Sequence, residues 1–337
     1  MFAGIYKKIR FLYLRAISLC YAFLSTILCY KREIARVQYF FISKRSYFII
    51  KEWDIRYRQC LRHALKKNFI VATRDNMLRY KTCDTLFVLA SGPSINDITP
   101  EQWDTIAACD SIGFNYFFLH SHVPTYYNIE FRPSSVELLM ECYRATAPEF
   151  KKIPVMTNMY NLMDLPAGAV NQLGQQFKNL YVTVPKMFKG ASKQNLEEIL
   201  RYQYLYRNYA EDNLVVHYRA SLMMAITFGV LLGYKNIVLA GVDMDSNDYF
   251  FYDEKKYCSS VAEKVRKRKK QKIERYLKQK AAPVTMHKTL DPDIFKELPL
   301  DQAVLVLNES VLEPLGINLF LLSQKSVLYP ALKLYDH

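Results

Sequence analysis

Short apolar runs alternate along the chain, from residue 84 onward, with longer stretches that repeat apolar positions at helical spacing. Because strands that alternate with helices form parallel sheets, this order predicts an α/β protein with a mostly parallel, doubly wound sheet. The longest apolar stretch is expected to form a helix closed by Gly233, and a last helix is expected to start at Ser326. Seven runs are expected to form strands, and some of these ranges include the polar loop that follows the strand. They are residues 86–90, 109–118, 125–131, 153–158, 180–184, 236–248 and 317–323.

The first 80 residues follow a different pattern, which is helical and basic. In residues 51–68 the apolar side chains share one helical face, and arginines and lysines occupy the opposite face. Such a helix packs on its own domain or touches anionic lipid, and the sequence leaves both open. Residues 16–30 are uncharged and largely apolar, but they are shorter than the roughly 20 residues that a bilayer span needs. We expect a helix in the membrane interface, with a buried helix and a true span as alternatives.

The net charge of +14 is concentrated in two segments. Residues 1–80 contain 17 Lys and Arg against four Asp and Glu, and residues 264–280 contain ten against one. The rest of the chain is therefore mildly acidic. This asymmetry points to an anionic surface as a partner, either a membrane or a nucleic acid. The seven cysteines are scattered without a CxxC pair, which favours reduced cytosolic thiols over disulfides or a zinc site.

Small and polar residues follow several of the predicted strands. Because the carboxyl ends of parallel strands share one edge of a sheet, we expect these residues to meet in one crevice. Uncharged hydrogen-bonding groups suit a nucleotide, and the chain has neither a GxxxxGK[ST] nor a GxGxxG motif. A turn-forming role for each single Asn stays open. The residues in question are Ser91, Gly92, Pro93 and Ser94, Asn115, Asn128, and Gly241, Val242 and Asp243.

Two further groups carry candidate chemistry, each with a plainer alternative. Asp243 and Asp245 form an Asp-x-Asp after a strand, which holds Mg²⁺ or Mn²⁺ in many sugar-nucleotide transferases but also starts loops and caps helices. His287 follows the basic run, in the sequence "AAPVTMHKTLDPDIF". It could accept a proton from an acceptor hydroxyl, or it is an incidental loop histidine, since no partner is fixed by spacing.

Several of these motifs occur together, in order, in one known family. Gly92-Pro93-Ser94-Ile95 follows the first strand, "FNYFF" contains Asn115, and Tyr127-Asn128 ends a later strand. Ser221 opens the apolar helix that leads into "LLGYKNIVLAGVDM", and the last strand runs into "LLSQKSVL", which contains Ser326. Over about residues 84 to 330 the chain therefore resembles the bacterial sialyltransferases of glycosyltransferase family 42.

The resemblance implies a Rossmann-like fold of the GT-A variant and a transferase that uses a CMP-activated sugar, inverts its anomeric centre and needs no metal or other cofactor. It implies that His287 is the catalytic base, and that Asn115, Asn128, Ser221 and Gly241 hold cytidine, ribose and phosphate. The chain departs from the family at Ser91, where an Asn is usual, and at Asp245, where a Tyr is usual. The tyrosine that faces the departing phosphate is therefore expected to be Tyr249 or Tyr252.

The expected domains are a helical, basic, membrane-associating region at 1–80 and a glycosyltransferase domain at 81–337 with a lid at about 246–286. The predicted reaction moves sialic acid, or a related nonulosonate, to a hydroxyl of a cell-surface glycan or glycolipid such as lipooligosaccharide. The expected location is the cytoplasmic face of the bacterial inner membrane, at its anionic surface, with peripheral or monotopic attachment. A homo-oligomer is left open.

Three alternatives remain at this stage. One is a CMP-Kdo transferase, and another is a metal-dependent transferase of nucleotide diphosphate sugars that uses Asp243 and Asp245. The third is a non-catalytic nucleic-acid-binding protein that uses the N-terminal region and residues 264–280. The acidic body and the absence of a recognised nucleic-acid module argue against this last alternative, so no nucleic-acid partner is expected.

Overall fold

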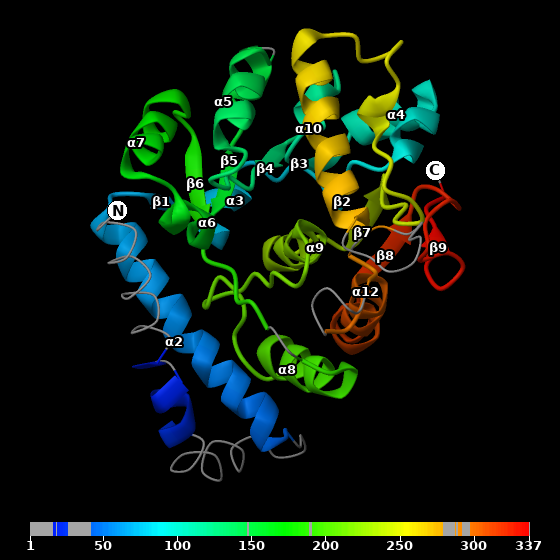
Figure 1. Ribbon diagram of the computed structural model, residues 1–337. Helices are drawn as coiled ribbons and strands as arrows, with labels where there is room; N and C mark the ends of the chain where they lie inside the picture. Colours follow the sequence, from blue (N-terminus) through cyan, green and yellow to red (C-terminus); the bar gives the residue numbers. More distant parts are fainter. Residues whose placement is uncertain are drawn as a thin grey trace.

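The structure is a computed structural model of the whole chain. It describes residues 16–17, 19–25, 42–146, 148–188, 191–278, 287, 289–291 and 297–336. Figure 1 shows a central sheet between two layers of helices, with α10 at the upper edge of that view and α2 at the lower left.

A nine-stranded sheet forms the centre of the described residues, and every neighbouring pair of strands in it is parallel. The strand order is β1-β6-β5-β4-β3-β2-β7-β8-β9. The strands are β1 (Ile70–Val71), β2 (Thr85–Leu89), β3 (Asp110–Phe114), β4 (Tyr126–Asn128), β5 (Val155–Asn158), β6 (Leu180–Thr183), β7 (Asn236–Ala240), β8 (Asn318–Leu321) and β9 (Lys333–Leu334).

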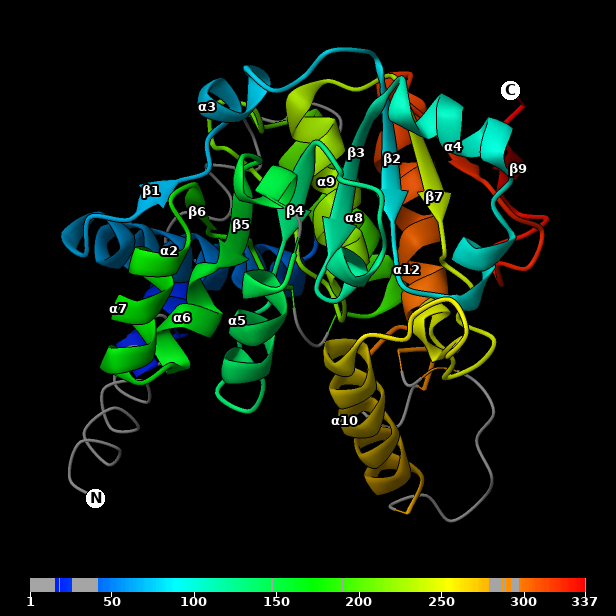
Figure 2. The same ribbon diagram turned by 90° about the horizontal axis from the view of Figure 1, so that it is seen from above.

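Helices cover both faces of the sheet, as Figure 2 shows from above. One face packs against α2 (Lys44–Lys66), α3 (Arg74–Leu78), α8 (Lys193–Leu205), α9 (Ser221–Leu232) and α12 (Leu300–Leu307). The other packs against α4 (Pro100–Ala107), α5 (Val136–Arg144), α6 (Met159–Asp164), α7 (Ala167–Gln176) and α10 (Ser260–Leu277). Short helical turns are η1 (Pro93–Asp97), η2 (Phe117–Leu119), η3 (Pro148–Lys151), η4 (Phe250–Tyr252), η5 (Asn308–Leu312) and η6 (Glu313–Leu315).

The central strands are buried on both faces, which explains their nearly continuous apolar sequences. Phe87 and Leu89 of β2 face one hydrophobic core, whereas Leu86 and Val88 face the other. Helix α9 lies against the second of these cores and is apolar around its whole circumference, as a fully buried helix must be. Gly233 ends α9 in the left-handed conformation, with φ of 70°.

Successive strands are added to one side of β2 and later to its other side, so the strand order reverses between β2 and β7. Strands β3 to β6 lie on one side of β2, while β7 and β8 lie on the other. In open parallel sheets, the crevice outside the carboxyl ends of the two strands at this switch point is where ligands bind. The fold therefore places the loops after β2 and β7 at its expected binding crevice.

The predicted fold class is confirmed, and each of the seven predicted strands overlaps an observed strand. The helix expected at Ser326 is wrong, because residues 324–330 form turns. Pro330 has no N–H to donate to the Ser326 carbonyl, so a first helical turn cannot form there.

The boundary expected after residue 80 does not separate two folding units. Strand β1 pairs with β6, and α2 buries Tyr47, Ile50 and Trp53 in the core beneath the sheet. Of the two placements left open for residues 51–68, packing on the same domain is the one observed. Leu65, expected on the apolar face of this helix, is 59% exposed.

Residues 16–30, expected to form an interfacial helix, lie partly outside the described residues. The described positions 19–25 are helical, and their large apolar side chains are exposed. Among the described residues, no helix has the length and apolar character needed to cross a bilayer. The expected lid at 246–286 contains η4 and α10, and its residues 279–286 lie outside the described part.

Candidate active site

The loops after β2 and β7 are joined directly to each other at the switch point. The Gly92 N–H donates to the Gly241 carbonyl at 2.8 Å, which continues the ladder between the two strands. A Cβ atom at Gly92 would lie only 2.6 Å from the same oxygen. Gly241 has φ of 68°, and a Cβ there would lie 2.6 Å from Cγ1 of Ile95. Gly92 is therefore required by close approach of backbone, and Gly241 by its left-handed conformation and the contact with the Ile95 side chain.

The Asp243 side chain fastens these two loops together. Its Oδ2 accepts a hydrogen bond from the Ser94 N–H at 2.8 Å, and its Oδ1 accepts one from the Ser94 hydroxyl at 2.5 Å. Burial raises the pKa of Asp243, while the two bonds from Ser94 act in the opposite direction. Asp245 is exposed, and the described residues contain no group of three side chains arranged to hold a metal ion. The Asp-x-Asp pair thus has a loop-building role at its first member.

Ser326, predicted to contact the donor nucleotide, hydrogen-bonds to the backbone of the loop after β7. Its hydroxyl donates to the Val242 carbonyl at 2.6 Å, and the next N–H, of Val327, donates to the Asp243 carbonyl at 3.1 Å. Ser326 is buried. In this structure its side chain shapes the backbone of the loop that Gly241, Val242 and Asp243 form.

The loop after β2 also positions the segment that contains the predicted tyrosines. Pro93 begins η1, and the Ser91 carbonyl accepts a hydrogen bond from the Phe250 N–H at 3.1 Å. The Asn96 amide donates to the Phe250 carbonyl at 2.8 Å. Tyr249 and Tyr252 flank this anchored residue, so the sheet edge fixes the place of both.

Asn115 and Asn128 lie side by side at the ends of β3 and β4. The Asn115 N–H donates to the Asn128 carbonyl at 2.9 Å, and the Asn115 side chain accepts from the Glu130 N–H at 2.9 Å. Asn128 is fully buried, and neither polar atom of its amide has a hydrogen-bond partner among the described residues. Because buried amides are nearly always bonded to protein, water or ligand, this group is suited to holding a ligand.

Glu130 links Asn115 to the start of α9 and was not predicted from the sequence. Its carboxylate accepts a hydrogen bond from the Ser221 hydroxyl, and it lies 3.3 Å from Nε2 of His217 and 2.6 Å from Arg132. Burial raises the pKa of Glu130, but the bond and charge of His217, with Arg132 and Ser221, outweigh burial and hold it well below 4.5. Ser221 therefore reaches the crevice already paired with a carboxylate.

His287 lies at the end of β7 although more than forty residues separate it from that strand. Its N–H donates to the Met244 carbonyl at 3.1 Å, and its Nδ1 lies 2.8 Å from the Thr289 hydroxyl. The Arg219 guanidinium holds the following segment by donating to the carbonyls of Thr289 at 2.6 Å, Asp291 at 3.2 Å and Glu297 at 3.0 Å. Arg219 was also missed at the sequence level.

Tyr249 is the predicted tyrosine that lies beside His287. The two rings are perpendicular, with centroids 6.4 Å apart, and Tyr249 stacks on Phe251 at 5.1 Å. Lys269 of α10 places its ammonium 4.3 Å from the centre of the Tyr249 ring. The Tyr252 hydroxyl is buried without a partner among the described residues, and burial raises the pKa of both tyrosines.

The predicted residues thus form two groups along one edge of the sheet. The first joins the loops after β2 and β7 to Tyr249 and His287, and the second joins Asn115, Asn128 and Ser221 through Glu130. Lys269 lies between the groups, since its ammonium is also 5.0 Å from the ring centre of Tyr116, which follows Asn115. A histidine, buried polar groups and a cation along such a crevice are the components of a group-transfer site with a general base.

No family model matches the chain, and no curated protein matches it. Among solved structures, the monofunctional α-2,3-sialyltransferase Cst-I of Campylobacter jejuni is 16% identical, with a TM-score of 0.41 over 80% of this chain and 84% of that one. CstII of Campylobacter jejuni, in complex with the substrate analogue CMP-3FNeuAc, is 14% identical, with a TM-score of 0.37 over 75% of this chain and 85% of that one. A CstII variant in complex with CMP is 15% identical, with a TM-score of 0.42 over 74% and 86%. The matched proteins are sialyltransferases, the class that the sequence motifs resemble.

Proposed function

We propose that this chain is a glycosyltransferase that moves sialic acid, or a related nonulosonate, from a CMP-activated donor to a hydroxyl of a glycan. The observation that carries the proposal is the position of His287. His287, the candidate base of the sequence analysis, contacts Met244 and Tyr249 beyond the carboxyl end of β7. The donor nucleotide would occupy the switch-point crevice, with Gly92 and Gly241 allowing close approach and the Asn128 amide available to bond it.

The proposed reaction is a single displacement with inversion and without a metal ion. The acceptor oxygen attacks the anomeric carbon, the bond from that carbon to the phosphate oxygen breaks, and CMP departs. His287 takes the acceptor proton. The Thr289 hydroxyl lies 2.8 Å from Nδ1, and an Nδ1–H that donates to it would place the proton-accepting lone pair of the ring on Nε2. Tyr249, whose ring lies beside His287, would stabilise negative charge that develops on the departing phosphate.

We further propose that the enzyme works at the cytoplasmic face of the bacterial inner membrane on a glycolipid such as lipooligosaccharide. The described helical positions 19–25 expose Phe23 (60%) and Leu24 (53%), and basic residues are concentrated in the first 80 positions. An apolar helical face with basic neighbours is suited to the interface of an anionic membrane.

The test of the proposed base is His287→Ala, with His217→Ala as the matched control because His217 bonds Glu130 and lies outside the base position. His287→Ala should lower the rate of transfer from a CMP-sugar by at least about 100-fold and leave CMP affinity unchanged. His217→Ala should retain transfer within about tenfold, since it removes one contact to Glu130. Transfer that survives in His287→Ala at the wild-type rate would remove His287 from the reaction.

A further inference from the structure

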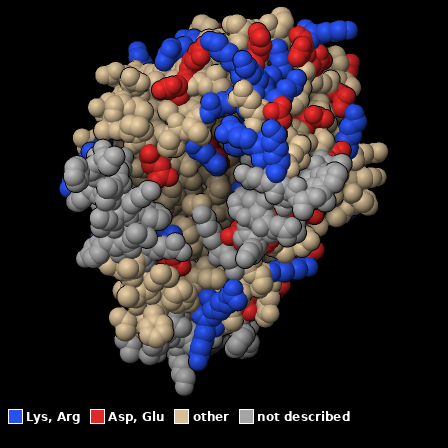
Figure 3. All heavy atoms as spheres, viewed as in Figure 1, with Lys and Arg blue, Asp and Glu red and all other residues tan. Residues whose placement is uncertain are grey.

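Three cationic side chains influence one another beside the proposed active site: burial, and then the charges of Lys269 and Arg132, lower the pKa of Lys272. Lys269 and Lys272 lie one turn apart on α10, and Arg132 comes from the loop after β4. Figure 3 shows Lys and Arg gathered along the upper side of a hollow on this face of the molecule. Lys269 is half-buried, with its ammonium 4.3 Å from the Tyr249 ring and 5.0 Å from the Tyr116 ring.

Within the described part of the chain, this positive charge is only partly balanced. Glu130 is the carboxylate that faces the three cations, but its oxygens are already used by Arg132, Ser221 and His217. Neither Lys269 nor Lys272 has an ion pair with a carboxylate in the described part of the chain. Burial lowers the pKa of Lys269 to about 8, an effect that Glu130 partly offsets and Arg132 increases. A bound anion would relieve this repulsion.

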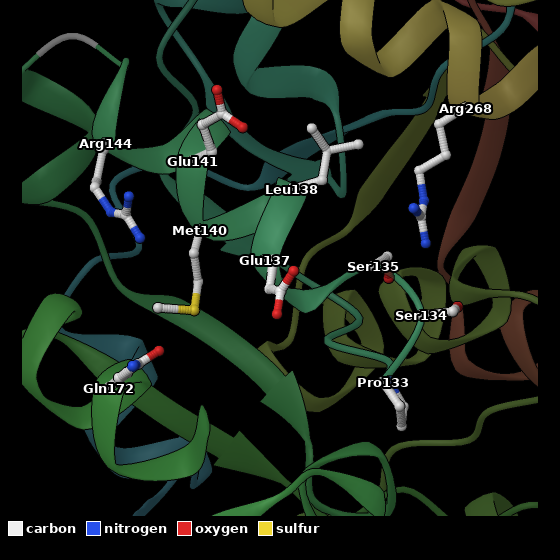
Figure 4. A pocket seen from close by; sticks show the side chains of 10 residues that line it. All are labelled: Pro133, Ser134, Ser135, Glu137, Leu138, Met140, Glu141, Arg144, Gln172 and Arg268. Atoms are coloured by element: carbon white, nitrogen blue, oxygen red, sulfur yellow. The ribbon is translucent and has the colours of Figure 1, made fainter. Parts of the chain in front are cut away.

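A groove lies next to the cations, between α5 and α10. It has a volume of about 540 Å³, and its lining is mainly polar. Figure 4 shows Arg268 of α10 on one side of the groove and, on the other, Met140 of α5 close to Gln172 of α7. The Ser135 N–H donates to the Arg132 carbonyl at 2.8 Å, so the edge of the groove is attached to the residue that supplies one of the three cations.

Building on the proposed function, we infer that Arg132, Lys269 and Lys272 form a subsite for an anionic group of the glycan acceptor. This group is a carboxylate or a phosphate. The other sugars of the acceptor lie in the groove between α5 and α10. The acceptor must reach His287, and Tyr249 connects His287 to Lys269. The proposed function places the donor nucleotide at the loops after β2 and β7. The enzyme would therefore select acidic acceptors over neutral ones.

Binding to immobilised oligosaccharides, in the presence of saturating CMP, tests this subsite without requiring transfer. The probes are pairs that differ by a single carboxylate, and separate pairs that differ by a single phosphate. The full-length wild type should bind the charged member of at least one series about tenfold more tightly. Lys269→Gln/Lys272→Gln should lose this preference while keeping the wild-type CMP affinity.

The matched control is Lys267→Gln/Lys278→Gln, which removes the same charge from exposed positions of the same helix region. It should keep the preference for charged probes. Equal losses in both double variants, no preference in the wild type, or a loss of CMP affinity in Lys269→Gln/Lys272→Gln would overturn the subsite. A wild type that does not bind CMP would contradict the proposed function itself, which is a separate and distinguishable result.

Discussion

The Asp243 carboxylate takes both hydrogen bonds that Ser94 can offer, from the N–H at 2.8 Å and from the hydroxyl at 2.5 Å. This pair closes the two loops of the switch point onto each other. Ser94→Ala would leave one buried carboxylate oxygen without its donor, which should lower the free energy of unfolding by about 1–3 kcal/mol.

Urea denaturation at pH 7 measures this loss. Ser323→Ala is the control, because the Ser323 hydroxyl accepts one exposed bond from Lys325 and its removal should cost less than about 0.5 kcal/mol. Similar losses in the two variants would show that the bridge to Asp243 adds nothing to stability.

Gly233 and Gly241 have nearly the same φ. Replacing each with alanine therefore separates the energetic cost of a left-handed backbone from the cost of crowding by neighbouring atoms. Gly241 has φ of 68° and faces Ile95, whereas Gly233 has φ of 70° with nothing within 4 Å of an added Cβ. Gly233→Ala should cost about 1 kcal/mol, from the left-handed backbone alone. Gly241→Ala should cost at least about 1 kcal/mol more, from overpacking against Ile95, and should also weaken CMP binding. Equal melting temperatures in the two variants would contradict the close approach.

The pKa of Glu130 lies below its ordinary value of 4.5, so its ionised form favours the folded state. The contribution to stability should be fully present above pH 4.5 and should decrease as the pH falls below that value. Glu130→Gln should therefore cost about 1–3 kcal/mol at pH 7. The difference from wild type should shrink when the urea titration is repeated at pH 4. A difference that is the same at both values would mean that the charge of Glu130 does not stabilise the fold.

Arg219 is expected to act as a positioning residue for His287. Arg219→Met removes donors to three carbonyls of the segment after the histidine, so kcat should fall by about tenfold while the KM for the donor changes little. Amide exchange in residues 287–291 should become faster.

Arg207→Met is a suitable comparison, since Arg207 pairs with Asp54 and Asp212 away from the crevice. It should reduce stability without changing kcat. If the two variants change kcat equally, Arg219 acts only through general stability.

The strands and the loops at their ends could be predicted because burial on both faces leaves long apolar runs that stop at Gly, Asn or Asp. His287 was a candidate base from its place in the sequence, and the resemblance to a family motif favoured that role over an incidental loop histidine. Glu130, Arg219 and Lys269 were missed, because each acquires its role from contacts with residues far away in the sequence. No local spacing marks such contacts.

Two differences between the predicted and the observed fold have local causes. The two-residue strand β1 is too short to give an alternating pattern, so the sheet appeared to begin after residue 80. The helix expected at Ser326 failed because Pro330 removes the first helical hydrogen bond. The pairing of Asp243 with Ser94 was not predicted, because it spans 149 positions in the chain.

Calorimetric titration of the full-length protein with CMP, UDP and GDP, each with and without EDTA, is the most direct test of the central claim. The account predicts that CMP binds in preference to UDP and GDP and that EDTA does not change its affinity. A preference for UDP or GDP that disappears in EDTA would contradict it. That result would assign the crevice to a metal-dependent transferase that uses Asp243 and Asp245.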